Sequence, residues 1–329
     1  MINYVLFAIQ YVSGSGTDYN DSNMASSSPA WNIKPDELTI SDKVLGDGKY
    51  SRVYRAKLDK NGELIPVAAK VLLNRDVNVE ELTTLEKLSI NPHKNIIKFY
   101  GAVRSQTENK TTIVTELASN ESLYDFLQKM KVEKKFPLST KRILTWALDG
   151  AHAIKHLHDN DIMHRDIKSP NFLIMDDMTM KLCDFGISVP DGKNTKTTGG
   201  TRGTTRWKAP EVFDEKVSHK SDIFSFGAVM WEMIMCEEPY HEYQNESRLM
   251  KQICVHEKKL GPLPQSCPEE LVKLIADCRA RERDERPTIE EIIRRLTILQ
   301  QQHVANLEHG KLELKTLKFQ SLQMLTYYI

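Results

Sequence analysis

The chain has 329 residues, and 40% of them are hydrophobic, which is enough for a sizeable core in one large domain or two smaller ones. Its 45 Lys and Arg residues balance 45 Asp and Glu residues, so the formal net charge is zero. This balance argues against binding nucleic acid or an anionic membrane through bulk charge. Any phosphate site must therefore be local.

The first 30 residues are predicted to be a flexible leader. Residues 1–12 are apolar, but they are too short to span a bilayer and no Lys or Arg precedes them, which disfavours the alternative of a signal peptide. Residues 13–30 are rich in Ser, Gly, Asp and Asn, as linkers are. Five widely spaced cysteines without a CxxC pair indicate reduced thiols and a cytoplasmic protein. No membrane span is expected.

A glycine-containing turn follows the first expected strand. The alternation of Leu38 and Ile40 predicts an edge strand that leads into the segment 46–54, where two glycines lie between alternating residues. Glycine lets a backbone approach phosphate oxygens closely. Because a strand and not a helix follows the turn, a dinucleotide-binding fold is disfavoured and a flap over a nucleotide fits better.

A single lysine lies in the next apolar strand, residues 66–72. Lys70 would be costly to bury without a partner of opposite charge. The segment Val79–Ile90 has helical spacing and offers Glu80, Glu81 and Glu86. Glu81 is the predicted partner, because it lies one helical turn before a leucine of the apolar stripe, and the other two are expected to be solvated.

The hydrophobic period changes in the middle of the chain. Strands are expected at residues 96–103 and 111–117, and a helix is expected to begin at Ser122. The change predicts a small β-sheet lobe over residues 38–117 and a mainly helical lobe over residues 119–297.

A polar loop follows the long amphipathic helix expected at residues 138–158. It contains Asp166, Lys168 and Asn171 within eight residues. Asp166 can accept the proton of an attacking alcohol, Lys168 can hold the charge of a transferring phosphoryl group, and Asn171 offers an oxygen to a divalent cation. A strand at residues 179–183 then ends at Asp184, a second candidate ligand for Mg²⁺.

Taken together, these segments resemble the protein-kinase family. The motifs Gly46-x-Gly48, Val67-Ala68-Ala69-Lys70, His164-Arg165-Asp166, Asp184-Phe185-Gly186 and Ala209-Pro210-Glu211 occur in the family's order between about residues 38 and 296. The resemblance implies an α+β, bilobal protein-kinase fold over residues 31–297, with an antiparallel sheet and one helix in the small lobe.

The resemblance also implies the residue roles. ATP would be covered by the flap residues Leu45, Gly46, Asp47, Gly48, Lys49, Tyr50, Ser51, Arg52 and Val53. Lys70, paired with Glu81, would hold its phosphates, and Ala68 and Leu173 would sandwich the purine beside Thr115, Glu116 and Ala118. Asp166, Lys168 and Lys70 would be catalytic, and Asn171 and Asp184 would bind Mg²⁺. Asp222 is expected to anchor the catalytic loop, and Glu211 is expected to pair with Arg286.

The substrate class follows from smaller resemblances. Lys168 and Gly203-Thr204 are similar to serine/threonine kinases, whereas Trp31-x-Ile33 and Trp231-Glu232 look like tyrosine kinases. This mixture resembles the tyrosine-kinase-like group, and it looks most like mixed-lineage MAP kinase kinase kinases of the leucine-zipper and sterile-alpha-motif type. MAP kinase kinases in a stress pathway would be the substrates. The alternative is a pseudokinase scaffold that binds nucleotide and partners without catalysis.

Two regions carry expectations about regulation. Phosphorylation at Thr198 or Thr201, among several basic residues, is expected to activate the enzyme. Residues 298–329 are expected to form a helical C-terminal appendage, and since Gly310 interrupts its leucine pattern, a coiled coil is disfavoured. A homodimer is left open.

Overall fold

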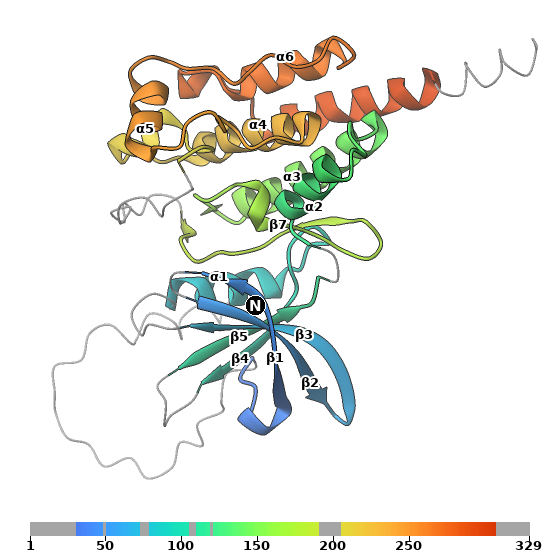
Figure 1. Ribbon diagram of the computed structural model, residues 1–329. Helices are drawn as coiled ribbons and strands as arrows, with labels where there is room; N and C mark the ends of the chain where they lie inside the picture. The colour runs from blue at the N-terminus through green and yellow to red at the C-terminus, as the bar shows by residue number, and fades with distance from the viewer. Residues whose placement is uncertain are drawn as a thin grey trace, which may run out of the picture.

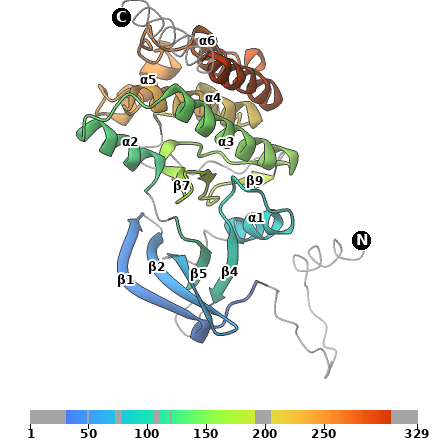
Figure 2. The same cartoon turned by 90° about the vertical axis from the view of Figure 1, so that its right-hand side faces the viewer.

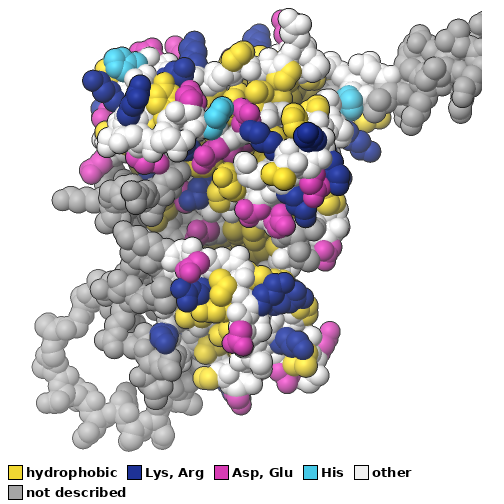
Figure 3. All heavy atoms as spheres, in the orientation of Figure 1, with side chains coloured by type: hydrophobic (Ala, Val, Ile, Leu, Met, Phe, Trp, Pro, Cys, Tyr) yellow, Lys and Arg dark blue, Asp and Glu magenta, His cyan; other side chains and the backbone are white. Residues whose placement is uncertain are grey.

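The computed structural model describes residues 31–48, 51–72, 79–104, 110–118, 121–190 and 205–306, without the side chains of residues 79, 80, 189 and 190. A five-stranded antiparallel sheet with one helix forms the small lobe, and helices make up most of the large lobe (Figure 1). The two lobes meet at a narrower waist, with hydrophobic side chains on both sides of it (Figure 3). The α+β, bilobal prediction is confirmed.

The sheet of the small lobe has the strand order β1-β2-β3-β5-β4. Its central strand is β3, in which Val67 and Ala69 are completely buried. Asn61 and Gly62 both have positive φ (58° and 85°) at the tight turn between β2 and β3, as a two-residue hairpin turn requires. The strands are β1 (Leu38–Asp47), β2 (Ser51–Lys60), β3 (Glu63–Leu72), β4 (Phe99–Arg104) and β5 (Thr111–Glu116), and a 3-10 turn at Pro35–Glu37 precedes them.

Helix α1 (Val79–Ile90) has the predicted bounds and lies beside β4 (Figure 2). Its buried stripe consists of Leu82, Leu85 and Leu88, spaced three residues apart as the sequence indicated.

The strand expected to begin at residue 96 begins later, at Phe99, so that prediction was wrong at its start. Ile96 and Ile97 are both 5% exposed, which breaks the alternation of a strand with one wet face. Instead, Ile97 N donates to Leu182 O at 2.9 Å, and Leu182 N donates to Asn95 O at 2.8 Å. This segment therefore joins the small lobe to a strand of the large lobe.

Residues 31–33 lie along the outer edge of β4. Ala102 N donates to Trp31 O at 2.9 Å, and Ile33 N donates to Ala102 O at 3.0 Å. Gly101, with φ of +148°, is required here, because a Cβ would lie 2.2 Å from Trp31 O. The contact covers an edge that would otherwise be open to another strand.

The helices of the large lobe surround α4, which is buried along almost its whole length and therefore shows no amphipathic pattern. Ser122 and Ser139 cap α2 and α3, with side chains that accept from Asp125 N and Arg142 N. The helices are α2 (Leu123–Val132), α3 (Thr140–Asp159), α4 (His219–Met235), α5 (Glu246–Cys254) and α6 (Glu269–Cys278), and residues 289–306 are also helical.

Shorter elements complete this lobe. Four short strands pair two by two: β6 (Ile162–Met163) with β9 (Val189–Pro190), and β7 (Phe172–Ile174) with β8 (Met180–Leu182). Three 3-10 turns lie at Ser169–Asn171, Pro210–Asp214 and Arg283–Glu285.

The helix over residues 289–306 runs across the predicted domain boundary at residue 298, and the rest of the predicted appendage lies outside the described residues. No helix in the described ranges combines the length and apolar composition needed to cross a bilayer. All five cysteines are free, although only Cys236 and Cys278 are fully buried.

Candidate active site

One face of the sheet turns several predicted site residues toward the large lobe. In the register of the sheet, Val53 pairs with Lys70, and Ala68 pairs with Thr115. Residues paired directly across a sheet, and residues two apart on one strand, share a face. Ala68, Lys70, Val53 and Thr115 therefore form one continuous surface.

The glycine turn connects β1 to β2 above this surface. Gly48 N donates to Ser51 O at 2.9 Å, and a Cβ on Gly48 would lie only 3.2 Å from the same oxygen. The negative charge of Asp47 is met by Arg52, whose guanidinium lies 2.9 Å from it at the surface. Lys49 and Tyr50 lie outside the described residues.

Lys70 brings together two carboxylates from distant parts of the chain. Its Nζ lies 2.7 Å from Glu81 Oε1 and 2.8 Å from Asp184 Oδ1. The prediction of Glu81 as its partner is confirmed. Burial lowers the pKa of Lys70, but the two carboxylates more than offset this and raise it above its ordinary value. Lys70 in turn lowers the pKa of Asp184 to about 2. Both groups are therefore charged at neutral pH.

The polar loop is arranged around Asp166. Lys168 Nζ lies 2.7 Å from Asp166 Oδ2, and Asn171 Nδ2 donates to the same oxygen at 3.1 Å and to Asp166 O at 2.8 Å. The other carboxylate oxygen, Oδ1, is buried and has no hydrogen-bond donor in the described part of the chain. Asp166 thus has one oxygen held in place and one oxygen that still lacks a donor.

Asp222, on α4, accepts hydrogen bonds from the backbone of the polar loop around Asp166, as predicted. Its carboxylate accepts from His164 N at 3.0 Å and from Arg165 N at 2.9 Å, and His158 Nε2 lies 3.0 Å away. Burial raises the pKa of Asp222, but its hydrogen bond and charge interaction with His158 outweigh this, and the net shift is downward. A second predicted pair is also present, because Arg286 binds Glu211 through two hydrogen bonds of 2.6 and 2.9 Å.

Strand β5 ends at Glu116, where a purine is expected, and most polar groups of Glu116 already make hydrogen bonds within the protein. Glu116 Oε1 accepts from Lys98 N and from Lys181 Nζ, each at 2.7 Å, and Glu116 N donates to Lys98 O at 2.9 Å. A purine placed at this strand end would therefore have to bind the remaining backbone groups of residues 116–118. Leu173, on β7, is half-buried, as a residue stacked on a ligand would be.

A magnesium ion fits the residues predicted to hold it. Asn171 uses its amide nitrogen for Asp166, which leaves its Oδ1 for a cation, and Asp184 uses only Oδ1 for Lys70. Within the described residues no group of three or more His, Cys, Asp or Glu could hold a metal by itself. A two-ligand set suits Mg²⁺, which completes its shell with phosphate oxygens and water.

A buried carboxylate that the sequence analysis did not assign connects three parts of the large lobe. Glu232 of α4 is 1% exposed; it accepts from Ser169 Oγ at 2.8 Å and from Trp207 Nε1 at 2.6 Å. Burial raises the pKa of Glu232 to about 8, although both hydrogen bonds oppose the shift. Glu232 is the single acid in the otherwise apolar run 223–235 of the sequence, and this was the available signal, since such a residue needs buried donors.

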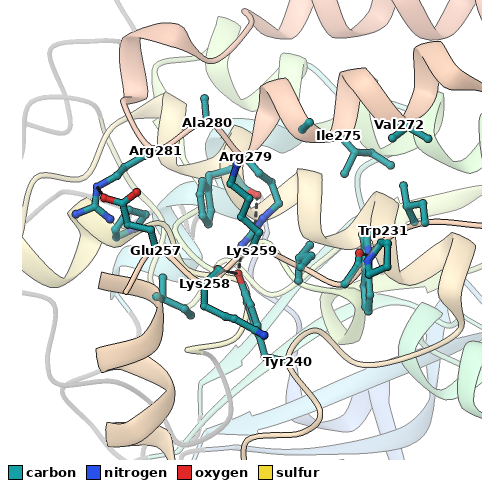
Figure 4. A pocket seen from close by; sticks show the side chains of 18 of the residues that line it. Trp231, Tyr240, Glu257, Lys258, Lys259, Val272, Ile275, Arg279, Ala280 and Arg281 are labelled. Atoms are coloured by element: carbon teal, nitrogen blue, oxygen red, sulfur yellow. Dashed lines mark hydrogen bonds and ion pairs between the residues drawn. The ribbon is translucent and has the colours of Figure 1, made fainter. Parts of the chain in front are cut away.

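A cavity of about 470 Å³ lies elsewhere, in the large lobe, between α4, α6 and residues 257–263 (Figure 4). Trp231, Tyr240 and Arg279 line it, and none of the predicted site residues does. It is therefore separate from the candidate active site. The threonines at positions 195, 197, 198, 201 and 204 lie outside the described residues.

Comparison with known proteins gives one family. A family model described as protein tyrosine and serine/threonine kinase matches residues 39–296. Stress-activated protein kinase alpha of Dictyostelium discoideum is 34% identical over 291 residues, covering 84% of this chain and 44% of that protein. The dual specificity protein kinase shkA of the same organism is 35% identical over 275 residues (80% and 50%). The serine/threonine-protein kinase CTR1 of Arabidopsis thaliana is 33% identical over 264 residues (78% and 31%). The chain thus spans half or less of the length of these relatives.

Proposed function

The chain belongs to the protein tyrosine and serine/threonine kinase family, and from that premise we propose that it transfers the γ-phosphoryl group of Mg-ATP to serine and threonine hydroxyls of proteins. The observation that carries the proposal is the state of Asp166. Its Oδ2 is held by Lys168 and Asn171, whereas its Oδ1 is buried without a donor among the described residues. A buried acceptor left unpaired is costly, and a substrate hydroxyl would supply the missing hydrogen bond.

The other residues divide the work of positioning and charge. Lys70, fixed by Glu81, would bind the phosphates of the nucleotide, and Asn171 and Asp184 would hold Mg²⁺. Bound Mg²⁺ would neutralise the charge that gathers on the phosphoryl oxygens. Asp166 would take the proton of the attacking hydroxyl, and Lys168 beside it would hold the phosphoryl charge.

A pseudokinase scaffold is the competing function. It has no need for Lys70, Asp166, Asn171 and Asp184 to converge, because buried polar groups are costly unless they serve binding or chemistry. Their contacts over 2.7–3.1 Å favour the enzyme.

The physiological role is the finer part of the proposal. We infer a MAP kinase kinase kinase of stress signalling in the cytoplasm, acting on MAP kinase kinases. Support comes from the resemblance to the tyrosine-kinase-like group and from the name of one relative, a stress-activated protein kinase. A homodimer belongs to the same proposal, and sedimentation of the purified chain would test it.

Activation by phosphorylation at Thr198 or Thr201 is proposed from sequence alone. A phosphothreonine among Lys193, Lys196 and Arg202 would gain charge-assisted hydrogen bonds. A Thr198→Ala, Thr201→Ala double variant should lose activity. Full activity without phosphate detectable by mass spectrometry would contradict this.

The central experiment is a transfer assay with Mg-ATP and matched serine, threonine and tyrosine peptides. Wild-type protein should phosphorylate the serine and threonine peptides, and Asp166→Ala should reduce the rate by about 10²- to 10⁴-fold, as loss of a general base does. Asp166→Ala should still bind nucleotide. Asp159→Ala is the matched control, because Asp159 is an exposed aspartate that pairs with Lys155 at the surface; its rate should stay at the wild-type level.

The outcomes separate the candidate functions. Nucleotide binding without transfer to any peptide, or to MAP kinase kinases, would favour the scaffold. Equal transfer to the tyrosine peptide would favour dual specificity, the property that the name of one relative states. Mapping the phosphorylated positions on candidate MAP kinase kinases would then test the proposed role.

A further inference from the structure

The cavity in the large lobe has walls from two helices and one loop (Figure 4). Ile275 of α6 lines it together with Arg279, four residues later, and this spacing places both on one face of the helix end. Phe224 and Trp231 of α4 also line it, and their spacing of seven residues places them on one face as well. Residues 257–263 form the third side. At about 470 Å³, the cavity has the size of a small-molecule site.

Arg279 is a positively charged residue held in the wall of this cavity. Its guanidinium lies over the ring of Phe224, 3.9 Å from the ring centroid, and donates to Tyr240 Oη at 2.7 Å and to Phe224 O at 3.4 Å. Gly227 of α4 leaves room for its stem, because a Cβ there would lie 2.7 Å from Arg279 Cγ. In the described part of the chain, no carboxylate pairs with Arg279. A guanidinium has more N–H donors than these two bonds use, so donors remain for a ligand.

The other charged residues of the cavity wall leave an excess of positive charge. Arg281 Nε lies 3.3 Å from Glu257 Oε1, so this pair is nearly neutral. Lys258 Nζ lies 3.9 Å from Glu242 Oε1, and Lys259 adds a further positive charge. The wall contains four basic residues against two acidic ones, namely Lys258, Lys259, Arg279 and Arg281 against Glu257 and Glu285. An excess of this sign favours an anionic ligand.

The cavity also has an apolar side. Figure 4 shows Val272, Ile275 and Trp231 together on one side of Arg279. The indole nitrogen of Trp231 donates to Gly261 O at 2.9 Å, which leaves the apolar part of the ring system for the cavity. A ligand that fills both parts therefore needs a negative group and an apolar body. Flat rings suit that body, because aromatic rings pack well against an indole.

We propose that this cavity binds a small aromatic carboxylate, with its carboxylate on Arg279 and its ring against Ile275 and Trp231. The planar guanidinium presents paired N–H donors that match the two oxygens of a carboxylate. Burial is the main cause that lowers the pKa of Arg279, and a bound anion would oppose it. The inference goes beyond the proposed function and does not depend on it, because none of the residues assigned to phosphoryl transfer lines the cavity.

The test is a titration of the purified chain with three compounds, followed by ligand-observed NMR. Cinnamate has both the ring and the charge, cinnamamide has the ring without the charge, and acetate has the charge without the ring. Cinnamate should bind with a Kd of about 1 mM, as expected for a ligand of its size. It should bind about tenfold more tightly than either of the other two compounds, because each of them lacks one of the two interactions.

Variants assign the binding to this cavity. Arg279→Met removes the charge and should bring the Kd of cinnamate to that of cinnamamide, whereas Arg279→Lys should keep a preference for cinnamate. Val272→Trp should abolish cinnamate binding by filling the cavity from its rim, where Val272 is 36% exposed and a larger side chain can be accommodated. Arg294→Met is the matched control, because Arg294 is an exposed arginine of the same lobe that does not line the cavity. Its Kd for cinnamate should equal that of wild type.

The wild-type titration can overturn the inference without any variant. It does so if cinnamate does not bind, or if cinnamate binds no more tightly than cinnamamide or acetate. A preference for cinnamate that survives Arg279→Met, or cinnamate binding that Val272→Trp leaves unchanged, would place the ligand elsewhere and would also overturn it. These measurements involve no ATP and no peptide, so their failure is distinct from failure of the proposed phosphoryl transfer.

Discussion

Replacing Glu232 by glutamine should change how the stability of the domain depends on pH. Burial raises the pKa of this carboxyl to about 8 in the folded protein, from an ordinary value of 4.5. Between these values the folded state keeps a proton that the unfolded state releases, so the free energy of unfolding falls as pH rises from 4.5 through 8. At about 1.4 kcal/mol for each pH unit, the loss amounts to about 3–5 kcal/mol.

Glutamine is a close mimic of the protonated acid. Its amide oxygen can accept from Trp207 Nε1, and its amide nitrogen can donate to Ser169 Oγ, so both contacts of Glu232 survive in altered form. Because the amide does not titrate, Glu232→Gln should match wild type near pH 5 and exceed its unfolding free energy by about 3–5 kcal/mol near pH 8.5.

Urea unfolding at several pH values, followed by tryptophan fluorescence, measures this difference. Every other titrating group is common to both proteins, so the difference between them isolates Glu232. Glu282→Gln, which changes an exposed carboxylate of the same lobe, serves as the control and should follow wild type throughout. If the difference between Glu232→Gln and wild type stays constant from pH 5 to 8.5, Glu232 does not titrate as the structure indicates.

Two further predictions concern stability. Arg286→Ala should lower the free energy of unfolding by about 3–5 kcal/mol, because it leaves the half-buried Glu211 carboxylate without its counter-charge. Arg294→Ala breaks a surface pair and should cost less than about 1 kcal/mol; similar losses in urea unfolding would contradict the difference. Burial and two neighbouring imidazoles lower the pKa of His93 to about 4, so its folded form resists protonation and stability falls as pH drops below about 6.5. His93→Asn keeps an acceptor for Asn95 N. Between pH 6.5 and 5 its free energy of unfolding should fall by about 1 kcal/mol less than that of wild type, a difference that already allows for the partial exposure of the ring. Equal thermal shifts in both proteins would refute this.

The local sequence pattern was sufficient to predict a contact where a buried charge needs a partner at a fixed helical spacing. Lys70 in an apolar strand required a counter-charge, and helical phase selected Glu81 from three candidates, as the 2.7 Å contact confirms. The resemblance to protein kinases, and not a local pattern, implied that Asp222 holds the polar loop and that Glu211 pairs with Arg286, and both contacts are present.

The local sequence pattern gave the wrong secondary structure for a segment that bonds to the other lobe. Residues 96 and 97 are as apolar as a strand, yet they bond to β8 of the other lobe, and only the assembled structure decides that pairing. In the sequence, Glu232 carried information only as part of the dipeptide Trp231-Glu232. Its hydrogen-bond donors, Ser169 and Trp207, are 63 and 25 residues away in the chain. The hydrophobic period and the residue propensities reflect near neighbours in the sequence, whereas burial depends on residues that are distant in the sequence.

By itself, the sequence determined the types of the elements, the order of the motifs and the residues proposed to move a phosphoryl group, because these depend on side-chain chemistry and short spacings. The tertiary structure alone decided that Asp166 keeps one oxygen without a donor among the described residues and that burial raises the pKa of Glu232 far above its ordinary value. Desolvation and hydrogen-bond satisfaction are properties of the packed environment, and that environment is built from residues that no local stretch of chain contains.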